Sequence, residues 1–210
     1  MNRQTPYWDP QFGWQLDAAA EGGQAELDSS YGFGKIWSQA SLVQKLPDFS
    51  DFLASLPGFQ DSMRPFFLKM ARTRLAVRAY AGTSAPSKGL FFPMGGSEGF
   101  RGFSLAQRQG STVWVGSAEW RIPLVEHMET DFCDHVAGLR TIQLALFYDV
   151  GDAYANGRSA GAVAHGVGVG IRFDTVLLSF VERAMVRFDF AQAIDQGVGP
   201  QFWFGITQPF

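Results

Sequence analysis

The residues that most resemble a catalytic motif are Gly-Gly-Ser-Glu-Gly at positions 95–99. They match the G-x-S-x-G pattern of a nucleophile elbow, in which a strand before the serine and a helix after it hold the side chain on a strained turn. Here Pro93 precedes the pattern, and the Phe-Arg-Gly-Phe that follows is no helix start. The surrounding segments also have an antiparallel character, not that of βαβ units. The match is therefore weak evidence for an esterase, and we expect the chain not to be an enzyme.

A second group has the side-chain types that bind metal ions: His127, Asp131, Cys133, Asp134 and His135. Structural zinc sites favour short paired spacings such as C-x2-C or H-x3-H, and this segment repeats none of them. A solvated polar connector over residues 125–136 is the expected structure. The sequence therefore predicts no metal site here.

The glycines of Gly-Val-Gly-Val-Gly at residues 166–170 suggest a dinucleotide site only superficially. They lack the third glycine of G-x-G-x-x-G, and they fall inside a predicted strand. Glycines in a strand interior more often mark a place where another group approaches closely, such as the crowded inner wall of a barrel. We expect no cofactor.

Arg101 stands out because it lies within FFPMGGSEGFRGF, residues 91–103, where nothing on either side resembles a helix or a strand. A buried guanidinium cannot lose its charge and needs carboxylate partners. Glu119 and Asp149 fall on the polar faces of the two predicted strands that follow, and bidentate pairing with them would lock the loop. The alternative is a surface loop with a solvated arginine, which contributes little to stability. The residues alone leave both interpretations open.

The elements that position these residues are strands, because apolar and polar residues alternate with period two. In residues 72–82, for example, Arg74 and Arg78 share one face while Leu75 and Val77 share the other. The alternation predicts about eight strands, at residues 12–22, 31–45, 72–82, 112–124, 141–152, 166–174, 184–192 and 201–210. The abundance of phenylalanine and glycine, 20 and 24 residues, also suits β-structure with tight turns. The fold class is thus all-β and antiparallel.

The chemistry of the two predicted faces fits either of two environments. One face is purely apolar and the other carries Arg, Asp, Glu and Gly, as in a soluble sandwich whose charges meet water. No run approaches the roughly 20 apolar residues of a membrane-spanning helix, and the first residues lack the apolar core of a secretory signal. Strands of ten residues or more are, however, what a lipid-facing barrel uses, and a barrel needs no apolar helix. Both a membrane barrel and a soluble β-protein are compatible with the pattern.

One long segment lacks this alternation. Residues 48–59 place Phe49, Phe52, Leu53 and Leu56 at helical spacing before a Pro-Gly pair. We expect a short amphipathic helical insertion between residues 48 and 71, lying at a barrel rim or on a membrane surface.

Size and charge limit the remaining possibilities. The 210 residues suit one domain, residues 1–210, and nothing resembles a linker. The net charge of −3 gives no reason to expect nucleic acid as a partner, since that requires a clearly basic face. Cys133 is the only cysteine, so an internal disulfide is excluded.

The segment PMGGSEGFRGF resembles the lumenal loop motif of the BamA-type outer-membrane family, which includes assembly factors, TamA-like proteins and two-partner secretion transporters. In that motif a glycine pair precedes an Arg-Gly-Phe/Tyr tip. Later segments resemble the family's following strands in order: GSAEWRIPL, FYDVGDAY, GVGVGIRF, VRFDFA and the closing FWFGITQPF. The resemblance covers the chain from about Arg72 to Phe210, and residues 9–23 look like an earlier strand of the same barrel.

The resemblance implies a transmembrane β-barrel of the bacterial outer membrane with a loop inside it. The implied loop motif is Gly95, Gly96, Phe100, Arg101, Gly102 and Phe103, with Glu119 and Asp149 as inner-wall partners of the arginine. The implied C-terminal strand signal, read by the barrel assembly machinery, is Phe202, Phe204, Ile206 and Phe210. The expected function is insertion or translocation of client outer-membrane or secreted proteins. The alternative is a membrane anchor for an N-terminal enzymatic passenger such as a patatin-like lipase.

The number of strands differs from the family's pattern. The family barrel is similar to a sixteen-strand one, whereas about eight strands are predicted here. Eight strands close a barrel that its own side chains fill, which leaves no space for an inner loop. We therefore expect the C-terminal half of a barrel, completed by a missing N-terminal half or by a second chain.

Overall fold

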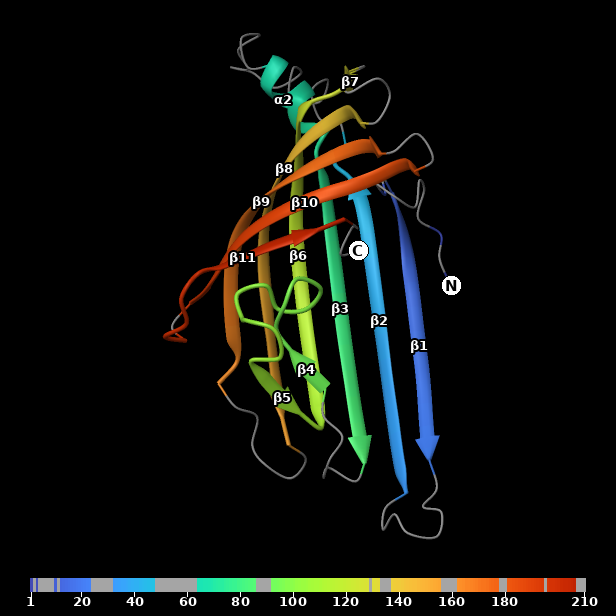
Figure 1. Ribbon diagram of the computed structural model, residues 1–210, viewed down its shortest axis with the longest axis vertical. Coiled ribbons are helices and arrows are strands. Elements are labelled where there is room, and N and C mark those ends of the chain that lie inside the picture. The colour runs from blue at the N-terminus through green and yellow to red at the C-terminus, as the bar shows by residue number, and fades with distance from the viewer. Residues whose placement is uncertain are drawn as a thin grey trace, which may run out of the picture.

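A computed structural model of the chain describes residues 1, 3, 10, 12–23, 32–47, 64–85, 92–128, 130–132, 137–155, 162–177, 181–194 and 196–206. These residues form an all-β structure dominated by one antiparallel sheet, with a single short helix among them (Figure 1). The predicted fold class is confirmed to that extent.

Eight strands of the described residues follow one another across the sheet in the order β1-β2-β3-β6-β8-β9-β10-β11. Each pairs antiparallel with its neighbours. Their bounds are β1 Gly13–Gly23, β2 Phe33–Lys45, β3 Arg74–Ala85, β6 Thr112–Val125, β8 Ala137–Tyr154, β9 Ala164–Leu177, β10 Val181–Ile194 and β11 Gln201–Gly205. Each of the eight segments that alternate in the sequence contains a strand, which confirms the predicted elements; the closing one, predicted over residues 201–210, is a strand over Gln201–Gly205, and residues 207–210 lie outside the described ones.

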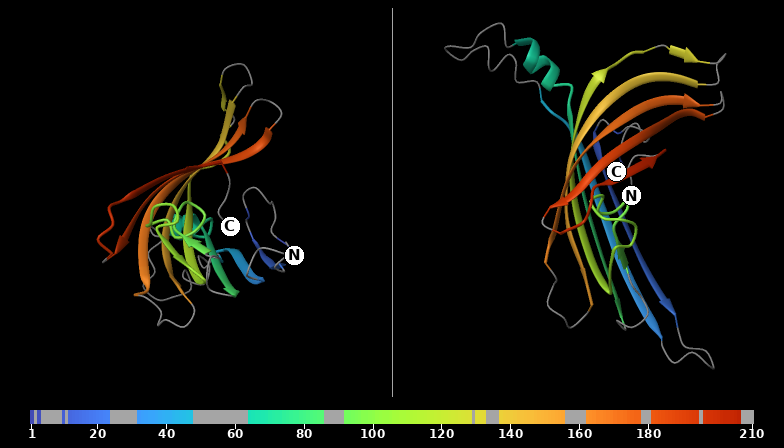
Figure 2. Two further views of the ribbon diagram at one scale, coloured as in Figure 1. Left: turned by 60° about the horizontal axis from the view of Figure 1, so that its bottom comes forward. Right: turned by 60° about the vertical axis from the view of Figure 1, so that its left-hand side comes forward.

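The sheet curls but does not close into a barrel (Figure 2). Within the described residues β1 and β11 are its two edges, and β11 pairs only with β10, over five residue pairs. Two backbone hydrogen bonds join the outer edge of β1 to the first residues of the chain. The N–H of Leu16 donates to the carbonyl oxygen of Met1 at 2.8 Å, and the N–H of Arg3 donates to the carbonyl oxygen of Trp14 at 2.8 Å. The β1 edge is therefore able to bond an antiparallel segment.

Three short strands were not predicted. β4 Phe92–Met94 and β5 Arg108–Gly110 form a separate two-stranded hairpin around the Arg101 segment, where the sequence indicated no strand. β7 Thr130–Phe132 pairs with β8 inside the segment expected to be a polar connector. Both expectations were wrong because three residues are too few to show an alternation of period two.

The helix of the described residues is α2 Arg64–Met70, beside the upper ends of the strands in Figure 1. It lies within the expected insertion, but after the Pro-Gly pair that was to end the helix. The predicted helical turn of Phe49, Phe52, Leu53 and Leu56 lies outside the described residues. In the part of the chain that is described, no helix is long and apolar enough to cross a membrane.

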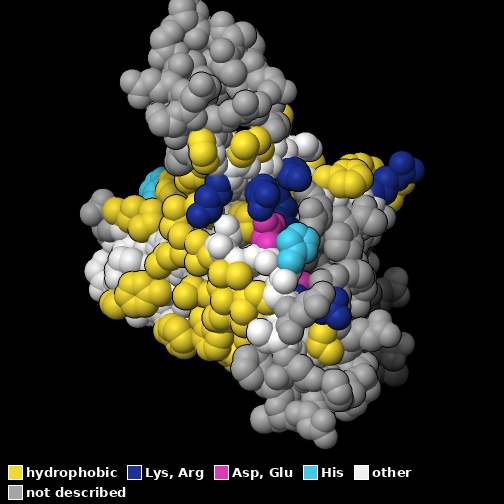
Figure 3. Space-filling model, turned by 90° about the horizontal axis from the view of Figure 1, so that it is seen from above, with side chains coloured by type: hydrophobic (Ala, Val, Ile, Leu, Met, Phe, Trp, Pro, Cys, Tyr) yellow, Lys and Arg dark blue, Asp and Glu magenta, His cyan; other side chains and the backbone are white. Residues whose placement is uncertain are grey.

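The two faces of the sheet have opposite chemistry, and the charged face is the buried one. On β8, Leu146 and Tyr148 are about two-fifths exposed while Asp149 is fully buried. The exposed face includes Leu75, Val77, Leu146, Tyr148, Val167, Val169, Ile171, Phe188, Phe190, Phe202 and Phe204. Figure 3 shows hydrophobic side chains gathered on the outside and charged ones towards the middle of the view. This polarity is the reverse of a soluble sheet, in which the apolar face meets the core.

Candidate functional site at the inner loop

The segment that contains Arg101 lies on the concave side of the sheet, and we call residues 95–107, between β4 and β5, the inner loop (Figure 2). Its entry requires glycine, because Gly95 and Gly96 have φ angles of 128° and 98°. A Cβ at Gly95 would lie 2.1 Å from the carbonyl oxygen of Ser104. The N–H of Gly96 donates to the oxygen of Phe103 at 3.1 Å, which closes the loop on itself. The glycine pair of the sequence motif thus sets the backbone path to the arginine.

Arg101 contacts both carboxylates named from the sequence. Its Nε and Nη2 donate to Oδ2 and Oδ1 of Asp149 at 3.0 and 2.8 Å, which is a bidentate pair. Its Nη1 donates to Oε2 of Glu119 at 2.7 Å. The backbone N–H of Arg101 donates to Asp149 Oδ2 as well, at 3.0 Å. The structure therefore brings the three residues together and fixes both the side chain and the backbone of the loop tip.

The site is enclosed, so these contacts are strong. The side chain of Arg101 is 2% exposed, and that of Glu119 is fully buried. The guanidinium carbon lies 3.4 Å from the centroid of the Phe147 ring, which adds a cation–π contact. Burial acts to lower the pKa of Arg101, but the charges of Asp149 and Glu119 outweigh it and raise that pKa above its ordinary value. Arg101 is therefore a permanent cation whose charge the wall neutralises.

Glu119 also joins the loop to the rest of the inner wall. It accepts from Nε of Arg121 at 2.9 Å and from Nη2 of Arg172 at 3.1 Å, in addition to Arg101. Arg172 in turn pairs with Asp189 on the neighbouring strand β10. One carboxylate on β6 thus links the loop, β6 and β9, and Asp189 extends the network to β10.

The sheet register contains two unfavourable pairings, and this network offsets one of them. Arg74 lies directly opposite Arg121 on β3 and β6, and Arg172 lies directly opposite Arg187 on β9 and β10. Like charges in directly opposite positions are destabilising. Asp189 offsets the second pair, because it contacts both Arg172 and, at 3.6 Å, Arg187. Asp189 therefore compensates the like charges of Arg172 and Arg187 across β9 and β10.

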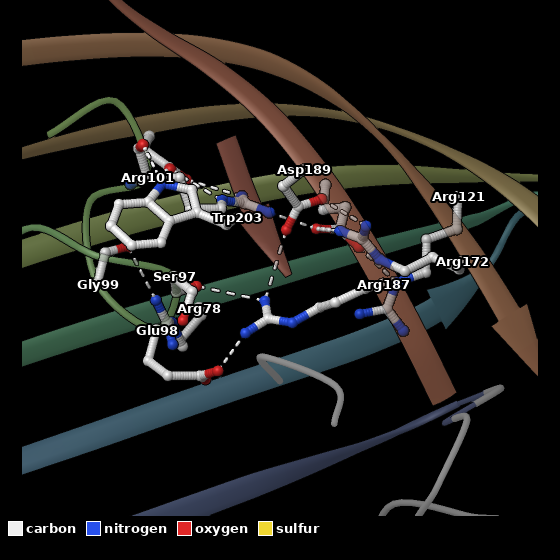
Figure 4. A network of polar contacts seen from close by, with 12 residues as sticks. Arg78, Ser97, Glu98, Gly99, Arg101, Arg121, Arg172, Arg187, Asp189 and Trp203 are labelled. Atoms are coloured by element: carbon white, nitrogen blue, oxygen red, sulfur yellow. Dashed lines mark hydrogen bonds and ion pairs between the residues drawn. The ribbon is translucent and has the colours of Figure 1, made fainter. Parts of the chain in front are cut away.

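Three further side chains of the wall hold the backbone of the loop (Figure 4). Arg78 on β3 donates from Nη2 to the oxygen of Gly99 at 3.3 Å, and Arg187 on β10 donates from Nη1 to that of Ser97 at 3.3 Å. Trp203 on β11 donates from Nε1 to the oxygen of Arg101 at 2.8 Å. Arg187 also pairs with the carboxylate of Glu98. The sequence reasoning missed these contacts, although the arginines lie on the charged face of predicted strands.

The aromatic residues of the motif fill the space below the arginine. The rings of Phe100 and Phe103 are buried, with their centroids 4.5 Å apart. A Cβ at Gly166 of β9 would lie 3.0 Å from the Phe100 ring, and one at Gly102 would lie 2.9 Å from the backbone of Ala193. Gly166 on β9 and Gly102 in the loop therefore allow the close approach of loop and sheet, and the expected crowding at the glycines of β9 is present.

Among the other sequence candidates, Ser97 lies in the inner loop and the rest lie apart from it. Ser97 is in a turn with no helix after it, unlike the serine of a nucleophile elbow. Of the residues with metal-ligand types, Cys133, Asp134 and His135 lie outside the described residues, and no group of three His, Cys, Asp or Glu in the described part is placed to hold a metal. Phe202, Phe204 and Ile206 are more than half exposed on the apolar face, and Phe210 lies outside the described residues.

The arrangement is a structural one, in which ion pairs and hydrogen bonds fix the inner loop to the sheet. Five strands, β3, β6, β8, β10 and β11, supply side chains that hold the loop. A comparison of the chain with protein-family models finds no match, and a comparison with curated proteins finds none either. The features of the chain that bear on its function are the polarity of the sheet and the geometry of the inner loop.

Proposed function

We propose that this chain forms one wall of an outer-membrane β-barrel of the BamA type, which acts in the insertion or translocation of other proteins. The observation that carries the proposal is the reversed polarity of the sheet. Its apolar face is exposed while its arginines and carboxylates are buried on the other side. A lipid-facing barrel wall requires this arrangement, because its outside meets hydrocarbon and its inside meets a polar lumen.

The dimensions of the strands support a membrane location. A strand that crosses a bilayer at a tilt needs about 9–11 residues. The seven strands from β1 to β10 along the sheet are 11 to 18 residues long. A strand also has to satisfy its backbone groups by pairing, because lipid offers no hydrogen bonds. We therefore propose that the lipid of the outer membrane covers the exposed face.

The open edges and the inner loop support a barrel larger than eight strands. A barrel of eight strands has no interior space for a loop held by five of its strands. The residues that complete the wall come from an N-terminal half or from a second chain, and the whole of residues 1–210 acts as one barrel domain. The barrel assembly machinery inserts it by reading the last strand.

The mechanism that we propose uses the two edges as a seam. β11 pairs with β10 over five residue pairs, whereas β1 pairs with β2 over eleven. An edge that is weakly paired bonds a client strand by β-augmentation. The β1 edge bonds the backbone of Met1 and Arg3 in an antiparallel manner, and this supports the proposal that it pairs with a client strand in the same way. The locked inner loop supports the wall, whose first and last strands form the weak seam.

The first experiment locates the native protein and measures its size. An antibody to the C-terminal peptide is used on isolated outer membranes, with boiled and unboiled samples compared by gel electrophoresis. We expect a heat-shifted band, which is the behaviour of a folded barrel. Extraction into buffer without detergent would overturn the membrane assignment. A band well above 23.1 kDa indicates a longer chain, and a band at that mass indicates a barrel of several copies.

The second experiment tests the activity. The purified protein is reconstituted in vesicles, and a urea-unfolded outer-membrane barrel is added as the client. We expect the client to become heat-shifted and protease-resistant faster than in empty vesicles. A folded protein that leaves client assembly at the rate of empty vesicles would contradict the insertion role and support the alternative role of a membrane anchor.

A further inference from the structure

We propose that Trp203 is a latch between the inner loop and the last strand, so that docking of the loop holds β11 against the sheet. This inference deepens the proposed function and rests on it for its consequence, since β11 is one edge of the seam. The coupling itself depends only on contacts within the chain. It has two links, one through Trp203 and one through Arg187.

The first link joins the two segments directly. The indole N–H of Trp203 donates to the carbonyl oxygen of Arg101 at 2.8 Å, across 102 positions of the sequence (Figure 4). Arg101 is the residue whose own N–H and side chain bond Asp149 and Glu119. The same peptide segment is therefore fixed on one side by β6 and β8, and on the other side it fixes β11.

This link matters because β11 has little else to hold it. It is a five-residue strand at the edge of the sheet, with β10 as its only partner strand among the described residues. Phe202 and Phe204 on its outer side are 65% and 55% exposed, so they contribute little burial within the chain. Besides the ladder with β10 and the ring contacts of Phe202 and Phe204 with Phe188, the hydrogen bond from Trp203 to the inner loop is one of the few contacts that hold this strand.

The second link runs through Arg187. This residue lies directly opposite Gly205 in the β10–β11 register, and its guanidinium bonds the oxygen of Ser97 and the carboxylate of Glu98. A Cβ at Gly205 would lie 2.6 Å from Nε of Arg187. The side chain that bonds the loop therefore passes against the end of β11, and glycine at that position lets it pass.

The consequence for the proposed function is a gate at the β11 edge. While Arg101 is locked, Trp203 bonds β11 to the loop, and the bonds of Arg187 to the loop keep its side chain in place against Gly205. When the loop leaves its carboxylates, the Trp203 bond is lost, Arg187 loses its loop partners, and the short strand is free to separate. The site that takes the client strand is thus regulated from inside the wall.

The latch is tested by amide hydrogen exchange of the purified protein in detergent micelles, followed on peptides that cover residues 201–206. Trp203→Phe removes the indole N–H and keeps an aromatic ring. We expect exchange of the protected β11 amides to rise about five- to tenfold, the factor that one hydrogen bond of ordinary strength supplies. The matched control is Trp120→Phe on β6, whose indole nitrogen has no hydrogen-bond partner among the described residues. Equal β11 exchange in the two variants would overturn the latch.

A second pair of variants tests the link through Arg187. The change is made on β11, and its effect is measured on the inner loop. Gly205→Ala displaces Arg187, and we expect faster exchange of peptides that cover residues 95–103. The control is Gly34→Ala on β2, where a Cβ would meet nothing within 4 Å. An inner loop that exchanges at the wild-type rate in Gly205→Ala would contradict coupling through Arg187.

Client assembly in vesicles is measured on the same preparations, so that failure of the latch and failure of the proposed function can be told apart. With the latch released, we expect Trp203→Phe to change the rate of client assembly while Trp120→Phe does not. A wild-type protein that assembles no client would overturn the proposed function and leave the exchange results in place. Unchanged β11 exchange, together with normal client assembly, would overturn the latch alone.

Discussion

Arg101 bonds Asp149 with both its side chain and its backbone. Nε and the backbone N–H donate to the same oxygen, Oδ2, at 3.0 Å each, and Nη2 donates to Oδ1 at 2.8 Å. A salt bridge made by a side chain alone fixes only the end of that side chain. Here one carboxylate on β8 also fixes the peptide at the tip of the inner loop. The loop therefore cannot leave the wall without exposing two charges that are both buried.

The first prediction concerns the loss of the arginine. Arg101→Ala leaves Glu119 and Asp149 as buried carboxylates, and removing one partner of a buried ion pair costs about 3–5 kcal/mol. We expect the free energy of unfolding, measured by urea titration of the heat-shifted band in detergent, to fall by that amount. The control is Arg72→Ala, which removes an exposed pair with Glu126 at 3.0 Å and costs about 0–1 kcal/mol. Equal losses in the two variants would show that Arg101 is not locked.

The second prediction tests whether the contact between Arg101 and Asp149 itself contributes to the free energy of unfolding. In a double-mutant cycle of Arg101→Met and Asp149→Asn, we expect a coupling energy of about 1–3 kcal/mol, because the residues share one network. Arg72→Met with Asp149→Asn is the control cycle, whose changes add within about 0.5 kcal/mol since the structure gives them no shared partner. Additivity in both cycles would mean that the contact between Arg101 and Asp149 contributes nothing of its own.

The strands could be predicted because each carries many alternating positions. β8 runs for 18 residues, so its period of two is clear from sequence alone. The same alternation assigned Glu119 and Asp149 to the polar faces of β6 and β8, where they meet Arg101. Which side of the sheet faces the core did not follow from the pattern, because an apolar face fits either protein or lipid. In the structure the arginines and carboxylates lie on the buried face, and the apolar side chains lie on the exposed one.

The contact made by Trp203 could not be predicted from the alternation of apolar and polar residues. The sequence placed it within the closing strand as one of several aromatics, and nothing in its type or spacing indicated a hydrogen bond to the loop. Its acceptor is the backbone oxygen of Arg101, whose position depends on the fold of the whole inner loop. The short strands β4, β5 and β7 were missed for a related reason, since three residues have no measurable period.

The third prediction separates a lipid-covered wall from a water-covered one. Leu146 is 39% exposed on the apolar face of β8. In a bilayer, an arginine at such a position costs about 2–4 kcal/mol near the midplane. We expect Leu146→Arg to lower the folded, heat-shifted fraction in vesicles. Leu105→Arg makes the same chemical change at a side chain of the inner loop that is 77% exposed, and we expect it to be near neutral. A surface in water predicts changes within about 0.5 kcal/mol for both variants.

The fourth prediction concerns the space that glycine leaves for the charge network. A Cβ at Gly170 on β9 would lie 2.1 Å from Oδ1 of Asp189 and 2.5 Å from Nη1 of Arg172. The ion pair is fully buried, and the same Cβ would lie 2.9 Å from the backbone oxygen of Phe188, which cannot turn away as a side chain can. We expect Gly170→Ala to reduce the free energy of unfolding by about 1–3 kcal/mol, as overpacking does in a dense interior. Gly34→Ala, at an open position of β2, is the matched control and is expected to be neutral or slightly stabilising. If both alanine variants unfold at the same urea concentration, the ion pair between Arg172 and Asp189 is not as tightly enclosed as its zero exposure indicates.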